Sequence, residues 1–409
     1  MYWRLLRDNR DFRLLYAGTL ISLGGDWFLT VALLDLVLEL TGSATLASLM
    51  LLCQTLPIFF FTPVAGPLVD RVDRRMLMVI VDLARAGACL LPLLARTPAT
   101  LPFAYAGVIL ISIGSAYFEP ASNAALPNLV RGKELGPANV LMGSTWGTML
   151  AVGAALGGIV TMKLGSDAAF LIDAASFLLS AGLLWGIRAH FSEKAGGPVE
   201  HPGLVESVRE TVRFARAHPR VLALLLSKGG FGIGAGGVAL LSVFGREVFH
   251  AGALGIGLLF AARGVGALLG PFVVRAISSD DDAMYRTIAW SIGLFGIGYM
   301  LLAGTKALAV GAVAVFFAHL GGGAQWQTST YGLQREVLDR MRGRIFSADY
   351  GFITLTMSLS SLAAGIMADA IGPVIATVAT ASLCLAWAGF WQAWTWRLWK
   401  PMSAKVPPP

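Results

Sequence analysis

Apolar stretches long enough to cross a lipid bilayer follow one another along the whole chain. A helix of about 20 residues spans the ~30 Å hydrocarbon core, and the 409-residue sequence contains twelve such stretches. They cover approximately residues 14–40, 44–69, 76–95, 101–126, 139–162, 168–188, 220–245, 254–275, 286–305, 307–333, 345–369 and 372–398. Only 13% of the residues are charged, against about 25% in soluble domains. The sequence therefore predicts an all-α membrane protein with twelve transmembrane helices.

Glycine is abundant for a helical protein, with 48 residues. In membranes, small residues spaced four apart let helix backbones approach closely. Three such pairs are Gly153 and Gly157, Gly232 and Gly236, and Gly266 and Gly270. We expect these glycines at helix–helix contacts, and we interpret the dinucleotide-like spacing of Gly232, Gly234 and Gly237 in the same way, because no strand precedes it.

The basic residues are distributed unevenly between the connecting segments. The net charge is +7, and 24 of the 31 lysines and arginines lie in segments on the side of the N-terminus. The opposite side has only Arg96, Lys163, Arg246 and Lys306. This bias predicts an inner-membrane protein with both termini in the cytoplasm. The membrane orientation of the chain therefore accounts for its positive net charge, and no nucleic-acid partner is expected.

A polar segment of about 30 residues divides the twelve stretches into six and six. Residues 204–215 within it have apolar positions near helical spacing, which indicates either an amphipathic surface helix or a solvated spacer. The expected organisation is a six-helix bundle over 1–188, a cytoplasmic linker over 189–219, a second bundle over 220–400 and a short tail over 401–409.

The two halves contain related motifs. "GPLVDR" (Gly66–Arg71) ends the second stretch and "GPFVVR" (Gly270–Arg275) ends the eighth. The longer run "GPLVDRVDRR" resembles the G-x-x-x-D-R-x-G-R-R loop of the major facilitator superfamily, with Asp73 in place of a glycine. "GAALGG" (Gly153–Gly158) is similar to that family's antiporter motif, and the whole chain resembles its bacterial branch of macrolide-efflux and enterobactin-export proteins. The resemblance implies two pseudo-symmetric six-helix bundles and transport by alternating access.

The resemblance also implies a cytoplasmic gate in this loop. The loop charges would hold the inner side closed by pairing with groups near the eleventh span, through contacts that are individually weak and breakable. The candidate gate residues are Gly66, Asp70, Arg71, Arg74 and Arg75, with Asp349 as the partner. The alternative is that the arginines only set the topology, although an aspartate beside them adds nothing to topology.

Charged residues inside the apolar stretches are costly and therefore require a reason. Asp26 lies on a polar stripe with Thr30 at helical spacing, and this stripe is expected to face a water-filled cavity. Glu119 precedes Pro120, which frees a backbone carbonyl in the fourth stretch. We interpret Asp26 and Glu119 as proton or cation sites; the alternative is a pair of hydrogen-bonded structural acids.

The remaining intramembrane charges differ between the halves. Asp82 and Arg85 are three residues apart and are expected to neutralise each other as a structural pair, and Asp173 is interpreted as a packing or hydration residue. The second half contributes Lys228, Arg263 and His319 to the predicted cavity. Acids on one wall and bases on the other would suit a zwitterionic or anionic amphiphile, or the bases could pair with acids and leave no net site.

Together these features predict a secondary transporter for an amphipathic small molecule such as a drug, macrolide or siderophore. Protons are the expected coupling ion, the chain is expected to act as a monomer, and no cofactor or metal is expected, because the sequence has no nucleotide-binding lysine loop and no metal-ligand cluster. A Gly25–Asp26 pair also occurs in a related lysophospholipid-transporting branch, so lysolipid movement is an alternative. An enzyme or a sensor is disfavoured, because no catalytic grouping or output domain is visible.

Overall fold

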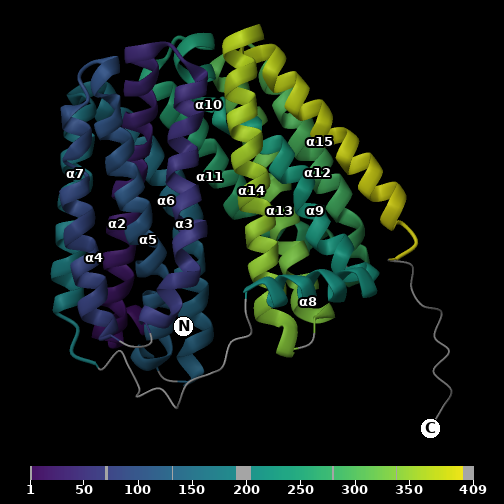
Figure 1. The fold of residues 1–409 in the computed structure, drawn as a ribbon, viewed down its shortest axis with the longest axis horizontal. Helices are drawn as coiled ribbons and strands as arrows, with labels where there is room; N and C mark the ends of the chain where they lie inside the picture. Colours follow the sequence, from purple (N-terminus) through teal and green to yellow (C-terminus); the bar gives the residue numbers. More distant parts are fainter. Residues whose placement is uncertain are drawn as a thin grey trace.

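The computed structural model describes residues 2–69, 72–130, 132–189, 204–278, 281–337 and 339–398. Twelve helical segments in this part are long and apolar enough to cross a membrane, one for each stretch that the sequence predicts. They form two bundles of six, which lie side by side in Figure 1. The linker residues 190–203 and the tail 399–409 lie outside the described residues, as do Asp70 and Arg71 of the predicted gate.

The first bundle contains the spans of the N-terminal half, preceded by the short helix α1 (Tyr2–Asp8). The spans are α2 (Arg10–Thr41), α3 (Ala44–Val69), α4 (Arg74–Ala88) with the 3-10 turn η1 (Leu91–Leu94), α5 (Leu101–Leu129), α6 (Leu135–Leu164) and α7 (Ser166–Trp185). The short 3-10 turns η2 (Pro98–Thr100) and η3 (Gly132–Glu134) precede α5 and α6.

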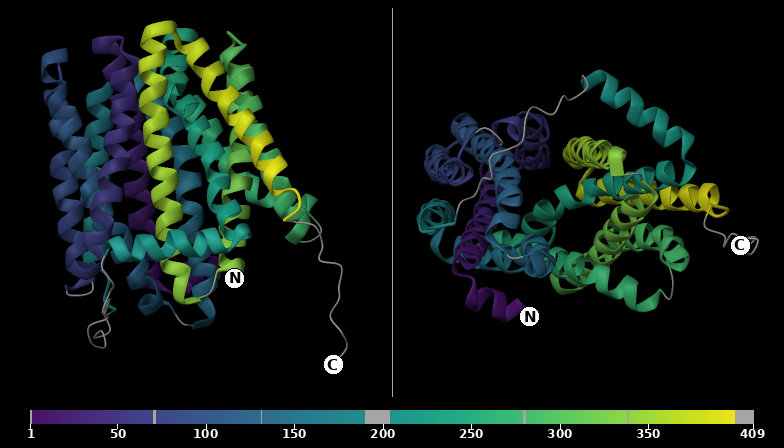
Figure 2. Two further views of the ribbon diagram at one scale, coloured as in Figure 1. Left: turned by 45° about the vertical axis from the view of Figure 1, so that its right-hand side comes forward. Right: turned by 90° about the horizontal axis from the view of Figure 1, so that it is seen from below.

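The second bundle begins with one span that is built from three consecutive pieces. These are α9 (Pro219–Ala239), α10 (Leu241–Val243) and the π-helical turn η4 (Phe244–Val248). The other spans are α11 (Gly252–Ile277), α12 (Asp281–Ala303), α13 (Leu308–Glu336), α14 (Asp339–Ile371) and α15 (Pro373–Thr395). The predicted linker helix is present as α8 (Leu204–Ala217), and Figure 2 shows it running across the spans at the end where the N-terminus lies.

Polar caps define where several of these helices begin. Asn9 accepts a hydrogen bond from the backbone N–H of Phe12 at 2.9 Å and starts α2. Asp73 accepts from the N–H of Met76 at 2.8 Å and starts α4. The departure from the family's loop pattern at Asp73 is therefore an N-cap, which satisfies an otherwise unpaired helix-terminal donor.

The pseudo-symmetry of the halves extends to single turns. Gly165 separates α6 from α7 at φ 83°, and Gly372 separates α14 from α15 at φ 89°. Both turns connect the fifth and sixth spans of their half. A residue with a Cβ atom would be strained at this positive φ, which explains glycine at both places.

The predicted glycine pairs lie at helix–helix contacts. A Cβ atom at Gly153 would lie 3.0 Å from the carbonyl oxygen of Gly24 in α2, and one at Gly157 would lie 2.9 Å from Cα of Phe28. In the second half, Gly232 and Gly236 pack against α14, whereas Gly266 and Gly270 pack against α13. The small-residue spacing therefore predicted these contacts correctly, and Gly232-x-Gly234 is part of a packed helix.

The two bundles are joined along two seams, between α6 and α11 and between α3 and α14. In the first seam a Cβ atom at Gly158 would lie 2.7 Å from the carbonyl oxygen of Ala253, so the backbones nearly touch. We call the end of the molecule with the α2–α3 connection the distal end and the end with the N-terminus the proximal end. Figure 1 shows the bundles close together at the distal end and diverging toward the proximal end.

Candidate functional site

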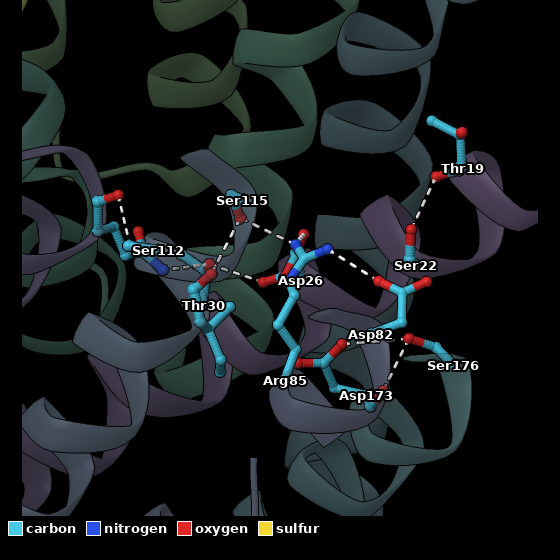
Figure 3. Close-up of polar contacts among 12 residues, drawn as sticks. Thr19, Ser22, Asp26, Thr30, Asp82, Arg85, Ser112, Ser115, Asp173 and Ser176 are labelled. Atoms are coloured by element: carbon cyan, nitrogen blue, oxygen red, sulfur yellow. Dashed lines mark hydrogen bonds and ion pairs between the residues drawn. The ribbon is translucent and has the colours of Figure 1, made fainter. Parts of the chain in front are cut away.

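A single buried arginine organises the polar interior of the first bundle. Arg85 on α4 donates to Asp82 at 3.2 Å, to Asp26 at 3.3 Å and to Ser115 at 2.9 Å. Its guanidinium also lies 4.1 Å from the ring centroid of Phe177, a cation–π distance. Asp82 and Arg85 are thus in contact as their spacing predicted, but the pair is not isolated, because the same guanidinium also holds Asp26 of α2 (Figure 3).

Asp173 on α7 extends this cluster. It is fully buried and accepts hydrogen bonds from the thiol of Cys89 at 3.1 Å and the hydroxyl of Ser176 at 3.2 Å. A Cβ atom at position 25 would collide with the carboxyl of Asp173, so Gly25 makes room for this acid next to Asp26. Its burial and hydrogen bonds suit the packing role predicted for Asp173, but its position beside Asp26 was not predicted. We call Asp26, Asp82, Arg85 and Asp173 the acidic network.

Glu119 on α5 lies at the edge of the acidic network. Its side chain is exposed, yet it is close enough to Asp26 and Arg85 to interact with them electrostatically. It also interacts with the exposed Tyr350 of α14, which belongs to the other bundle. An exposed acid between groups of both bundles faces the space between them and not the lipid. The side chain of Asp26 is less exposed than that of Glu119, at 25%.

The polar stripe on α2 is more deeply buried than its spacing predicted. Thr30, together with Ser22 two helical turns before it, is buried, at 5% and 4% exposure, so this part of the stripe packs within the first bundle. Thr30 donates to the carbonyl of Asp26 at 2.7 Å and accepts from the side-chain amide of Gln54 on α3 at 2.7 Å. Thr30 thus connects two helices behind Asp26, and the prediction that the whole stripe faces water is wrong.

Two of the three basic residues predicted for the cavity are satisfied inside the second bundle. Lys228 is 1% exposed, forms an ion pair with Asp349, donates to the hydroxyl of Thr330 at 3.3 Å and lies 4.3 Å from the ring of Trp326. His319 is 2% exposed and shares a 3.0 Å hydrogen bond with the hydroxyl of Tyr299. Both residues therefore belong to the core of α9, α12, α13 and α14 and do not line an open space, which corrects the prediction.

The predicted gate has a different arrangement in this conformation. Arg74 donates to the carbonyl of Ala124 at 3.0 Å, and Arg75 donates to the carbonyl of Ile187 at 2.7 Å. Both acceptors belong to the first bundle, and Gly66 lies within α3. Asp349, the expected partner across the bundles, is buried against Lys228 instead. In this conformation, which diverges at the proximal end, a cation on the neighbouring helix neutralises Asp349, and the predicted gate contact stays a prediction for the closed state.

The contacts that join the bundles at the distal end were not predicted. Arg246 on η4 pairs with Asp35 near the end of α2 and lies 3.5 Å from Glu39. Asp369 on α14 accepts from the N–H groups of Ala44 at 2.7 Å and Thr45 at 3.0 Å, and from the hydroxyl of Ser43 at 2.8 Å. We call Asp35, Glu39, Arg246 and Asp369 the distal latch.

A weak signal for the distal latch exists in the sequence. Arg246 is one of only four basic residues predicted on the sparsely charged side, so it is one of few cations available there to an acid. Asp35 is part of the first apolar stretch, and nothing in its local spacing indicates a partner 211 positions away. The pairing depends on how the bundles pack.

Arg263 is the one predicted cavity cation that has no counter-ion among the described residues. It is 9% exposed and lies 5.7 Å from the ring centroids of both Trp146 on α6 and Phe260 on α11. It therefore lies at the seam between the two bundles. The structure thus places Glu119 and Arg263 beside residues of the other bundle, and it places Lys228 and His319 in the core of the second bundle.

A family model described as transmembrane secretion effector matches residues 3–403 of this chain. Among curated proteins, macrolide efflux protein A of Streptococcus pyogenes is 24% identical over 90% of this chain and 91% of its own length. Multidrug efflux pump Tap of Mycobacterium tuberculosis is 28% identical over 88% of this chain and 87% of its own. The MFS-type transporter YfiS of Bacillus subtilis is 29% identical, and there the match spans about half of the relative, 53%.

Solved structures of transporters have the same fold. A POT family transporter in complex with 5-aminolevulinic acid superposes with a TM-score of 0.77, covering 96% of this chain and 97% of the other at 12% identity. At this identity the likeness concerns the fold alone. It agrees with the two six-helix bundles that the sequence predicted.

Proposed function

Because this chain belongs to the transmembrane secretion effector family of the major facilitator superfamily, as its motifs predicted, we propose that it exports an amphipathic small molecule in exchange for protons. The family and its relatives are transporters and not enzymes. Relatives named for macrolide and multidrug efflux, aligned over about nine-tenths of the chain, support export of drug-like substrates. Alternating access between the two bundles would carry the substrate across.

The observation that carries proton coupling is the surplus of acids around one base. Asp26, Asp82 and Asp173 are mostly or fully buried, Glu119 stands beside them, and Arg85 is the single cation in hydrogen-bond contact with any of them among the described residues. Ionising all four carboxyls around one guanidinium in a membrane interior would be very costly. Neutralisation by protons removes that cost, so this network is suited to bind and release them.

Asp26 is the member best placed to couple protons to movement. It is partly exposed while its carboxylate is held by Arg85. Protonation would weaken this ion pair and free Arg85 to favour Asp82, which changes the connection between α2 and α4. A proton that binds one conformation more tightly than the other shifts their populations, as any ligand does.

The positive-inside bias supports placing the proximal end in the cytoplasm of the cell and the distal end outside. The conformation described here, joined at the distal latch and divergent at the proximal end, would then receive substrate from the cytoplasm. Opening of the distal latch would release the substrate outside. We further propose that a single chain in the inner membrane is the transporting unit.

Asp26→Asn tests the proposal, because asparagine has nearly the same shape as aspartate but cannot bind and release a proton. Purified protein is reconstituted in liposomes with a pH gradient, and movement of erythromycin and ethidium is measured together with proton flux. Wild type is expected to move both protons and drug, and Asp26→Asn to lose proton-driven movement. Asp8→Asn is the matched control, because Asp8 pairs with Arg7 at the exposed proximal end.

The possible outcomes separate the alternatives. Proton-driven efflux that persists unchanged in Asp26→Asn would remove this residue from the mechanism. Drug efflux that continues after a protonophore collapses the gradient would refute proton coupling itself. If wild type moves fluorescent lysophosphatidylcholine and neither drug, the proposed substrate class is wrong.

A further inference from the structure

The seam between the bundles contains a small box of aromatic rings around one cation. Trp27 of α2 lies with its ring centroid 6.5 Å from that of Trp146 and 5.9 Å from that of Phe260. Arg263 approaches the same two rings, at 5.7 Å from each. We call Trp27, Trp146, Phe260 and Arg263 the seam box. Two of its members come from each bundle, so its shape depends on how the bundles meet.

The donors in the seam box lack acceptors. Arg263 makes no hydrogen bond or ion pair with any described residue, and its buried Nε is without a partner. The indole Nε1 of Trp27 is also buried and unpartnered. Two unsatisfied donors around the same rings are unusual, because buried polar groups in proteins are nearly always hydrogen-bonded. An unpaired charge and an unpaired indole N–H therefore lie at the same place.

Among the described residues, no acid of either bundle pairs with Arg263. Asp26, next to Trp27 in the sequence, is bonded to Arg85, and Asp349 is occupied by Lys228. Close backbone packing also keeps Arg263 at the seam, because a Cβ atom at the adjacent Gly264 would lie 2.5 Å from the backbone nitrogen of Ala151. The guanidinium therefore remains next to α6 without a counter-ion of its own.

We propose that the seam box binds the carboxylate of an amphipathic substrate whose apolar or aromatic body stacks on Trp146. This inference rests on the proposed export function and names the substrate class. Arg263 supplies a forked donor that matches a carboxylate, and the Trp27 indole supplies one further N–H. Trp146 is 46% exposed while Phe260 is fully buried, so the box opens at the tryptophan and is closed behind it.

Location makes this site relevant to transport. The box contains residues of α2 and α6 from one bundle and α11 from the other, so a carboxylate in it touches both. Separation of the bundles at this seam would move Trp27 and Trp146 away from Arg263 and weaken the site. A ligand held this way has different affinities in the two conformations, which alternating access requires.

A matched pair of probes tests the proposal in purified protein. Binding of 1-pyrenebutyrate and of its uncharged primary amide is measured by energy transfer from tryptophan to pyrene. Wild type is expected to bind the acid more tightly than the amide. Arg263→Gln should weaken acid binding by about tenfold or more, the loss typical of a charge-assisted hydrogen bond, and leave amide binding nearly unchanged.

Three controls keep the result interpretable. Arg263→Lys retains the charge and should give an intermediate affinity for the acid, which a folding defect would not produce. Trp27→Phe retains a ring without the N–H and should weaken acid binding by about two- to tenfold. Lys306→Gln removes one positive charge from the exposed distal loop and should change nothing.

Equal acid affinity in wild type and Arg263→Gln would overturn the inference, as would an equal loss of acid and amide binding. This failure is distinct from failure of the proposed function. A protein that exports ethidium with protons and ignores pyrenebutyrate would retain the function and lose the carboxylate site.

Discussion

Asp369 offers the clearest way to perturb the balance between conformations. Its carboxylate accepts three hydrogen bonds from Ser43, Ala44 and Thr45 at the start of α3, so it caps a helix of the opposite bundle. Asp369→Ala removes all three at once. Because α14 and α3 lie in different bundles, these bonds exist only while the distal end is closed.

The size of the effect follows from this geometry. A hydrogen bond to a charged group contributes about 1.5–3 kcal/mol and an ordinary one about 0.5–1.5, but Asp369 is exposed and its charge is screened. The three bonds together should therefore contribute about 1–3 kcal/mol, in line with measured N-caps. Since 1.4 kcal/mol is a factor of ten, Asp369→Ala should shift the equilibrium toward the distally open state about 5- to 150-fold.

The populations can be measured by pulsed electron paramagnetic resonance. Spin labels at Lys163 and Lys306 would report the distance between the bundles, because both residues are exposed at the distal end, one in each half. Cys53 would be replaced by alanine to avoid stray labelling, since it is half-buried whereas Cys89 and Cys384 are buried. Asp369→Ala is expected to increase the long-distance population.

Asp167→Asn is the matched control for this experiment. Asp167 is also an exposed acid at the distal end, with bonds of 2.9 and 2.7 Å to Arg96, but both residues belong to the first bundle. Breaking this pair should leave the distances unchanged. If Asp369→Ala gives the wild-type distribution, or if Asp167→Asn shifts it equally, then the capping of α3 does not hold the distal end closed.

Two further predictions concern buried packing. Lys228→Met should lower the free energy of unfolding by about 3–5 kcal/mol, because it leaves Asp349 charged and unpaired. Lys228→Met combined with Asp349→Leu should recover most of this loss. Denaturant titration in detergent compares the two, and additive effects of the two substitutions would contradict the pairing. Gly257→Ala should destabilise this conformation by about 1–3 kcal/mol, because its Cβ would lie 2.5 Å from the carbonyl oxygen of Ala154 across the seam. Gly293→Ala has open space around its Cβ and should be neutral or stabilising in the same unfolding assay; equal effects would refute the seam argument.

Much of the architecture is determined by local sequence. Twelve apolar stretches predicted twelve spans, since crossing hydrocarbon requires a run of apolar residues that pairs its own backbone groups. The glycine spacing predicted three helix contacts, because two glycines one turn apart mark a face that a neighbouring backbone can approach. The contact of Asp82 with Arg85 also followed, because residues three apart on a helix are neighbours.

Partners between distant helices could only be decided by tertiary packing. The sequence contained both Lys228 and Asp349 but did not pair them, and it gave no sign that Asp173 lies beside Asp26 or that Arg246 reaches Asp35. A charged residue in an apolar stretch indicates that some counter-charge or hydrogen-bond partner lies near it. Which of several candidates supplies that compensation depends on how far apart the helices pack and how they are rotated, and no periodicity along a single helix encodes either quantity.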